Sequence, residues 1–302
     1  IRKQLKNSTC FVYSDNVQYR WTTKDGEEKT VIPDATINCQ TKRKRGNSYV
    51  GIPRFVMEVI SPSTEKIDRG EKMKLYCEQE IEEYWIVEEY LDGVEISVEC
   101  CTFDGETTVI AIHDKYCDVC EPYFIEKTFV TPPPRFDREQ INKIEQMAKD
   151  VLSAIEYDYG IAHVEMKVTG KGPRLLEINA RVGGGLNMES VLYSTGINIL
   201  EVLLDIRRGI KPDIRIGKRN NVAFTMIPVV GGNVKKISGF SDALEVEHVF
   251  LAQPFLEVGD VVKARQANYG GFILAKDDEM STLLDALNVA EQKVNFEIER
   301  LA

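Results

Sequence analysis

Segment 160–185 carries the side chains of this chain that are best suited to chemistry. Its pattern predicts a strand, a tight turn at 170–173 and a second strand. Because side chains alternate between the two faces of a strand, we expect Glu177 and Asn179 on one face, with Glu165 beside them across the hairpin. Three oxygen ligands at one point suit Mg²⁺, which prefers octahedral oxygen coordination. The sequence therefore predicts a magnesium site on this hairpin.

Arg181 follows on the same alternation, and its two-pronged guanidinium suits a phosphate or a carboxylate. The glycines at 183–185 allow close approach of a ligand to the backbone. The alternative is a surface hairpin with scattered charges. We favour the metal site because the apolar sequence 175–178 predicts a buried strand, in which an unpaired Glu177 carboxylate would be costly.

Segments 163–165, 176–181 and 183–185 resemble the metal-binding end of ATP-grasp carboxylate–amine ligases, whose fold is shared with biotin carboxylase and D-alanine–D-alanine ligase. The spacing of 12 residues between the two glutamates also matches. The resemblance covers about 86–302. It implies ATP and Mg as cofactors, small-molecule carboxylate and amine substrates, an acyl phosphate intermediate, and a homodimer as is common in the family. In that mechanism Arg181 stabilises the charge of the transferred phosphoryl group.

The same resemblance implies the residues that contact the nucleotide. The backbone of a hinge strand containing Glu88, Glu89 and Leu91 would meet adenine, and Glu95 would accept hydrogen bonds from the ribose hydroxyls. Lys115 would lie near the transferred phosphate. Without the resemblance, these residues would be interpreted as charges on strand edges and a surface lysine.

Two carboxylates and a lysine form a second candidate site in the first part of the chain. Asp34 stands at the head of a strand expected over 31–37, Glu58 lies in another strand, and Lys72 lies in a helix predicted over 65–78. Two carboxylates that hold Mg²⁺ and a lysine that activates water are the minimum for phosphodiester hydrolysis. The alternative is an exposed aspartate and a satisfied glutamate in an ordinary sheet.

Segments 33–34, 58–64, 68–72 and 83–87 together resemble the Uma-type restriction endonucleases of the PD-(D/E)XK superfamily. The resemblance covers residues 1 to about 87. It implies a nuclease that uses Asp34, Glu58 and Lys72, and DNA as a partner of this segment.

The two resemblances predict an α+β protein with a truncated restriction-endonuclease-like α/β segment joined to an ATP-grasp-like domain. We expect an incomplete nuclease-like segment at 1–87, an ATP-grasp-like region without its N-terminal lobe at 86–215, and a β-rich lid with a terminal helix at 216–302. Helical periodicity predicts further helices at 137–157, 189–208 and 281–301. The chain therefore reads as a fusion.

Composition restricts the setting. The 302 residues carry a net charge of −10, and no apolar run reaches the roughly 20 residues that a membrane helix needs. An odd number of cysteines, seven, in a chain of this size favours a reducing, cytoplasmic location without membrane partners.

We interpret the chain first as an ATP-dependent carboxylate–amine ligase or a remnant of one, because that resemblance spans about 215 of 302 residues. The first alternative is a Mg-dependent nuclease. The second is a fusion remnant that binds metal or nucleotide without catalysis.

Overall fold

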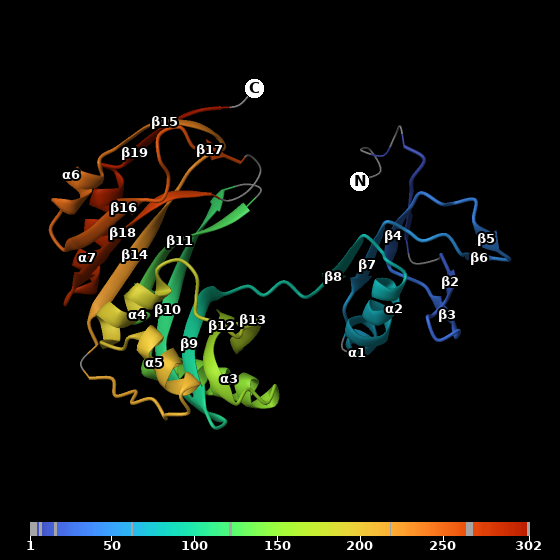
Figure 1. Ribbon diagram of the computed structural model, residues 1–302, viewed down its shortest axis with the longest axis horizontal. Coiled ribbons are helices and arrows are strands. Elements are labelled where there is room, and N and C mark those ends of the chain that lie inside the picture. The colour runs from blue at the N-terminus through green and yellow to red at the C-terminus, as the bar shows by residue number, and fades with distance from the viewer. Residues whose placement is uncertain are drawn as a thin grey trace. The chain divides into compact units, whose positions relative to one another are not determined.

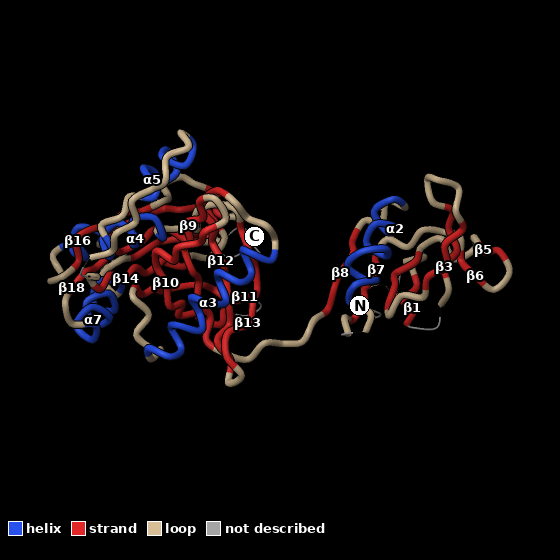
Figure 2. Tube along the Cα trace, turned by 90° about the horizontal axis from the view of Figure 1, so that it is seen from below, coloured by secondary structure: helices blue, strands red, loops and turns tan. Residues whose placement is uncertain are grey.

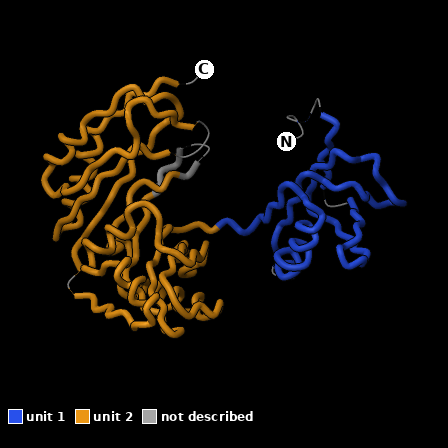
Figure 3. The backbone as a smooth tube through the Cα atoms, in the orientation of Figure 1, with its two compact units in different colours: residues 1–90 blue, residues 91–302 orange. Residues whose placement is uncertain are grey.

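The computed structural model describes residues 5, 8–14, 17–61, 63–120, 123–217, 219–263 and 268–300. The chain divides into two compact units, Ile1–Tyr90 (unit 1) and Leu91–Ala302 (unit 2), as Figure 3 shows. Each unit has its own sheets and its own buried apolar residues. Among the described residues, no helix has the length and apolar character needed to cross a membrane.

Unit 1 contains two sheets of short strands (Figure 1). The first has the order β1 (Phe11–Ser14), β4 (Ala35–Asn38), β7 (Phe55–Val59) and β8 (Glu83–Val87). The second has the order β3 (Glu28–Val31), β2 (Tyr19–Thr22), β6 (Ser48–Tyr49) and β5 (Lys44–Arg45). The single strand expected over 31–37 is wrong: β3 ends at Val31 and β4 begins at Ala35. Pro33 lies between them and has no amide hydrogen for a ladder.

The helix predicted over 65–78 is confirmed, although it contains one wider turn. It runs as α1 (Glu65–Ile67), the π-helical turn η1 (Asp68–Lys72) and α2 (Met73–Glu78). Leu75 and Tyr76 on α2 are buried in the core of unit 1, together with Tyr19, Trp21, Tyr49 and Val56.

A disulfide joins Cys10 and Cys39 in unit 1. The sequence favoured a reducing compartment, so this disulfide was not expected. The cytoplasmic location stays a prediction.

Unit 2 is built on an eight-stranded sheet whose neighbouring strands are all antiparallel (Figures 1 and 2). Its order is β13 (Gly172–Asn179), β12 (Tyr159–Thr169), β9 (Val94–Phe103), β10 (Glu106–Cys120), β11 (Tyr123–Thr131), β14 (Asn221–Pro228), β18 (Tyr269–Asp277) and β16 (Val249–Pro254). A three-stranded sheet follows the order β17 (Val261–Val262), β15 (Gly232–Ser238) and β19 (Asn295–Glu299).

Helices cover both faces of the large sheet. On one face, α3 (Arg138–Ala154) buries Ile144, Ala148 and Leu152 against β9, β10 and β12. On the other face, α4 (Asn187–Thr195) and α5 (Ile199–Arg207) bury a second apolar cluster. At the far end of the sheet, α6 (Phe240–Leu244) and α7 (Met280–Glu291) pack against β14, β16 and β18. The strands near the candidate site are therefore fixed from both sides.

The predicted helix boundaries hold in part. The helix expected from 137 is confirmed as α3. The single helix expected over 189–208 is wrong, because Gly196, with φ of +78°, ends α4 before α5 begins. The helix expected over 281–301 ends at Glu291. Residues 295–299 instead form β19, which pairs with β15.

Candidate functional site

The predicted hairpin is confirmed as β12 and β13. Glu165 lies directly opposite Glu177, and His163 lies opposite Asn179. Residues opposite each other in an antiparallel pair share a face, so the register brings the three predicted metal ligands to one face of the hairpin.

The prediction that 175–178 is a buried strand is wrong. Leu175 and Leu176 are 37% and 42% exposed, and Glu177 is also exposed. The cause is topological, since β13 is the edge strand of the eight-stranded sheet. The Glu177 carboxylate therefore carries no burial cost, and burial gives no reason to prefer a metal ligand at this position.

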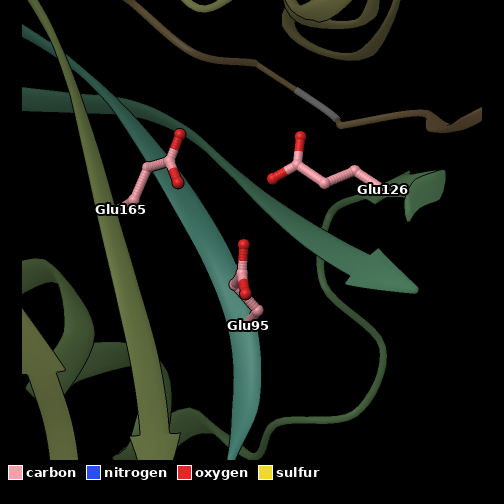
Figure 4. Close-up of side chains that lie close together, drawn as sticks. All are labelled: Glu95, Glu126 and Glu165. Atoms are coloured by element: carbon pink, nitrogen blue, oxygen red, sulfur yellow. The ribbon is translucent and has the colours of Figure 1, made fainter. Parts of the chain in front are cut away.

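Lys115 is the centre of a cluster of carboxylates. Its Nζ lies 2.6 Å from Glu126 Oε1, 3.1 Å from Glu165 Oε2 and 3.3 Å from Glu95 Oε1, and its side chain is 1% exposed. Figure 4 shows the carboxylates of Glu95, Glu126 and Glu165 turned toward a common space, from β9, β11 and β12. The surface position that was the alternative for Lys115 is therefore excluded.

The close contact between these groups shifts their pKa values. Burial lowers the pKa of Lys115, but the carboxylates of Glu126, Glu165 and Glu95 outweigh burial and raise it above the usual value. Burial raises the pKa of Glu95, although Lys115 opposes the shift. One oxygen from each of the three glutamates lies within 4.8 Å of the others, an arrangement that could hold a cation. The ammonium of Lys115 lies where these carboxylates converge, and His163 and Lys167 add further positive charge beside Glu165 and Glu95.

A chain of hydrogen bonds leads from buried Glu99 to Glu165 on the β12–β13 hairpin. His163 Nδ1 lies 2.6 Å from Glu99 Oε1, and His163 Nε2 lies 3.0 Å from Glu165 Oε1. Burial lowers the pKa of His163, but the hydrogen bonds to Glu165 and Glu99 outweigh burial and raise it to about 9. The hydrogen bond from His163 lowers the pKa of Glu165 to about 2, with help from Lys115 and against the effect of burial. At neutral pH the imidazolium therefore donates to both carboxylates.

The glycines at 183–185 have different surroundings. A Cβ at Gly183 would lie 2.3 Å from Glu99 Oε1 and 2.7 Å from His163 Nδ1, whereas one at Gly184 would meet nothing within 4 Å. The close approach at Gly183 is therefore to the protein's own side chains. Gly184 and Gly185 border the cavity near Arg181.

A cavity of about 280 Å³ unites part of the predicted site. The predicted residues that line it are Lys115, Glu165 and Arg181. The other described lining residues are Glu126, Phe129, His163, Gly184, Gly185, Asn187, Phe224, Met226 and Tyr269. Glu126 was missed by sequence reasoning because nothing local distinguishes it from other strand glutamates. Glu177, Asn179 and Glu95 are not part of the described lining.

The hinge strand expected to contain Glu88, Glu89 and Leu91 is wrong. The strand β8 ends at Val87 and β9 begins at Val94, so these residues lie in a connecting segment without strand structure. Adjacent acidic residues followed by Asp92-Gly93 interrupt the apolar alternation that a strand requires. Glu88 forms an ion pair with Arg69.

In unit 1 the structure brings Glu58 and Lys72 together. Lys72 Nζ lies 3.0 Å from Glu58 Oε2 and 2.8 Å from Asp68 Oδ1. Tyr76 donates a 2.5 Å hydrogen bond to Glu58 Oε1. Glu58 and Asp68 are almost completely buried. Burial raises the pKa of Glu58, with Tyr76 and Lys72 opposing the shift.

Asp34 lies beside this pair along the backbone. Its Oδ2 accepts a 2.7 Å hydrogen bond from the amide of Val59, the residue after Glu58. The predicted trio therefore shares one end of the sheet at β4 and β7. Sequence reasoning quoted Asp68 in a motif but gave it no role. Its i, i+4 spacing from Lys72 was the available signal.

Two family models match the chain. Residues 59–189 match an ATP-grasp domain, and residues 1–109 match Uma2, described as a putative restriction endonuclease. Both models cover 59–109, the region that includes β8 and β9.

Curated relatives match smaller parts of the chain. Carnosine synthase 1 from Homo sapiens is 27% identical over 124 residues, which is 41% of this chain and 15% of the relative. Alanine–anticapsin ligase from Bacillus subtilis (strain 168) is 30% identical over 181 residues, 59% of this chain and 35% of the relative. The chain thus spans 15% and 35% of the length of these two relatives.

A solved structure shows the fold. The L-amino acid ligase from Bacillus licheniformis superposes with a TM-score of 0.63 at 18% identity, over 94% of this chain and 69% of the ligase. The predicted resemblances to ATP-grasp ligases and to Uma-type endonucleases are confirmed, as is the predicted α+β fold class.

Proposed function

We propose that unit 2 is the metal- and phosphate-binding part of an ATP-dependent carboxylate–amine ligase. The observation that carries this proposal is the convergence of Lys115, Glu165 and Arg181 on one cavity beside the β12–β13 hairpin. The match of residues 59–189 to an ATP-grasp domain supports it. The proposed substrates are a small carboxylate, a small amine and ATP.

The residues fit Mg²⁺. Glu165, Glu177 and Asn179 offer oxygen donors from facing positions of one hairpin, which is the donor type that Mg²⁺ prefers. When bound, Mg²⁺ would neutralise charge on the phosphates.

The chain's own side chains have distinct roles in this proposal. Lys115 and Arg181 present positive charge to the phosphates and the substrate carboxylate. His163 holds Glu165 in place through its Nε2 hydrogen bond. The nucleotide contacts assigned to Glu88, Glu89, Leu91 and Glu95 stay predictions, as does a homodimer.

A thermal-shift titration with Mg·ATP, beside Mg²⁺ alone and ATP alone, tests the proposal. A ligand that binds only the native state stabilises it by about 2.7 kcal/mol at 100 times its Kd. We expect a shift that needs both components, and its loss in Glu177→Ala. The matched control is Glu106→Ala, an exposed glutamate of the same sheet that pairs with Lys211. A wild-type-sized shift in Glu177→Ala would contradict the proposal.

If the shift is present, release of ADP with small carboxylates and amines identifies the substrates. We expect ADP release in wild type only when a carboxylate is supplied. Release that is equal in Glu177→Ala would remove the ligase assignment.

A second candidate is a Mg-dependent nuclease in unit 1, favoured by the buried contact between Glu58 and Lys72 beside Asp34. We expect Mg²⁺- or Mn²⁺-dependent cleavage of DNA that is lost in Glu58→Ala. Cleavage should also be lost in Lys72→Met. Its control is Lys66→Met, which changes a lysine of α1. If the wild-type protein does not cleave DNA, unit 1 is interpreted as a non-catalytic remnant.

A further inference from the structure

Glu99 is a fully buried carboxylate on β9 that contacts the two segments of the proposed Mg·ATP site. Its Oε1 accepts the 2.6 Å hydrogen bond from His163 on β12, and its Oε2 lies 3.4 Å from the amide nitrogen of Gly183. The first contact leads to Glu165 through the other nitrogen of His163. The second leads into the loop that contains Arg181 and Gly184. No sequence motif identified Glu99.

We propose that Glu99 is a positioning residue that fixes the positions of both the proposed metal ligand Glu165 and the loop at 181–185. This inference rests on the proposed function of unit 2. One carboxylate oxygen fixes the orientation of the His163 ring, and the other fixes the backbone at Gly183. The position of Glu165 relative to this loop, which faces the proposed phosphate site, is thereby fixed.

The packing at Gly183 supports this assignment. A Cβ there would lie 2.3 Å from Glu99 Oε1, 2.5 Å from Asn187 Nδ2 and 2.7 Å from His163 Nδ1. All three distances are below any that real Cβ atoms adopt, so an alanine would displace the side chains it meets. Glycine is needed at 183 because the loop closes directly over the Glu99–His163 contact.

Chemistry explains why an acid is required at 99. A carboxylate has two accepting oxygens and can receive both the imidazole N–H and the amide N–H. A glutamine has only one accepting oxygen, and if that oxygen receives the Gly183 amide, its NH₂ group faces His163 Nδ1, which can accept only when the imidazole is neutral. Glu99→Gln therefore either breaks one of the two links or leaves His163 as neutral imidazole, while it keeps the size of the side chain.

The test measures metal and nucleotide affinity separately, so it does not depend on turnover. ADP binding is titrated by calorimetry with Mn²⁺ and with EDTA, and free Mn²⁺ is counted by electron paramagnetic resonance. Partners of metal ligands typically change metal affinity by about 10- to 100-fold when they are replaced. We expect Glu99→Gln and Gly183→Ala to weaken Mn²⁺ binding by at least about 10-fold, and to weaken ADP binding in EDTA, which reports the loop without the metal, by less than that.

Matched controls lie in the same sheet. Gly170→Ala changes a glycine of the β12–β13 turn where an added Cβ meets nothing within 4 Å. Glu106→Gln changes an exposed strand glutamate. Both are expected to keep the wild-type affinity for Mn²⁺.

Each result decides the inference. Unchanged Mn²⁺ affinity in Glu99→Gln, or equal losses with Mn²⁺ and with EDTA, would overturn it and leave the proposed function intact. Wild-type protein that binds ADP no better with Mn²⁺ than with EDTA would overturn the proposed function together with the inference. If Glu99→Gln does not fold, Gly183→Ala, which keeps the acid, decides by the same two measurements.

Discussion

At the scale of single residues, His113 shows how burial sets protonation near the site. It lies on β10, fully buried, with its Nδ1 2.5 Å from Thr131 Oγ1. Burial lowers its pKa to about 3, and the positive charges of His163 and Lys115 act in the same direction. The folded protein therefore holds His113 as neutral imidazole at neutral pH, beside an imidazolium at His163.

This difference predicts a pH dependence of stability. Because the folded pKa is depressed, the contribution of neutral His113 is present above the unfolded value of 6.5 and is lost as pH falls toward 3. As pH falls below 6.5, we expect protonation of this group to lower the free energy of unfolding of unit 2 by up to about 1.4 kcal/mol per pH unit. In His113→Gln that part of the slope should vanish in urea titrations at pH 4 to 7. Equal slopes in both proteins would contradict the prediction.

Sequence reasoning identified residues that belong to local motifs. Glu165, Arg181 and Lys115 reach one cavity, and Glu58 meets Lys72, as their motifs implied. Residues whose role depends on distant partners could not be found in this way. Glu126 contacts Lys115 only through the pairing of β10 with β11, and Glu99 contacts His163 only through the pairing of β9 with β12.

At the scale of elements, local signals predicted where α3 begins. Asp137 is its N-cap and accepts a hydrogen bond from the Gln140 amide, while the Gln140 side chain accepts one from the Asp137 amide. The later boundaries failed because tertiary contacts decided them. Residues 295–299 alternate in exposure and pair with β15, which a helical reading of the C-terminal segment did not include.

The capping box predicts a measurable contribution to stability. Asp137→Ala leaves the Gln140 amide at the start of α3 without its acceptor, and we expect a loss of about 1 kcal/mol in the free energy of unfolding. Asp150→Ala, at an exposed position within the same helix, is the control and should cost less. Chemical denaturation of both variants measures the difference, and equal losses would show that the cap is not the cause.

At the scale of the whole molecule, each unit has its own core. Unit 1 is organised around Tyr19, Trp21 and Tyr76, and unit 2 around the two faces of its large sheet. The family models overlap at 59–109, so they do not separate at the division between the units. The sequence predicted the junction at 86–87, and the compact units divide after Tyr90.

Separate cores predict two unfolding transitions in calorimetry. Mg·ATP should raise only the transition of unit 2. A reductant should lower only that of unit 1, because the Cys10–Cys39 disulfide typically contributes about 2–4 kcal/mol. Cys10→Ser should remove the response to reductant. A single transition that shifts with either reagent would contradict the prediction.

The edge position of β13 affects how fast its amides exchange and how fast a metal bound at the proposed site could leave. Within the described residues this strand pairs only with β12, so its outward-facing amides lack a partner strand. We expect these amides to exchange with deuterium faster than those of β9, and exchange near Glu177 to slow with Mg·ATP. Equal exchange in both strands would count against this. If the edge opens by itself, a metal bound at the proposed site would be able to leave through local fraying of β13, so its residence time would be independent of the lifetime of the folded sheet.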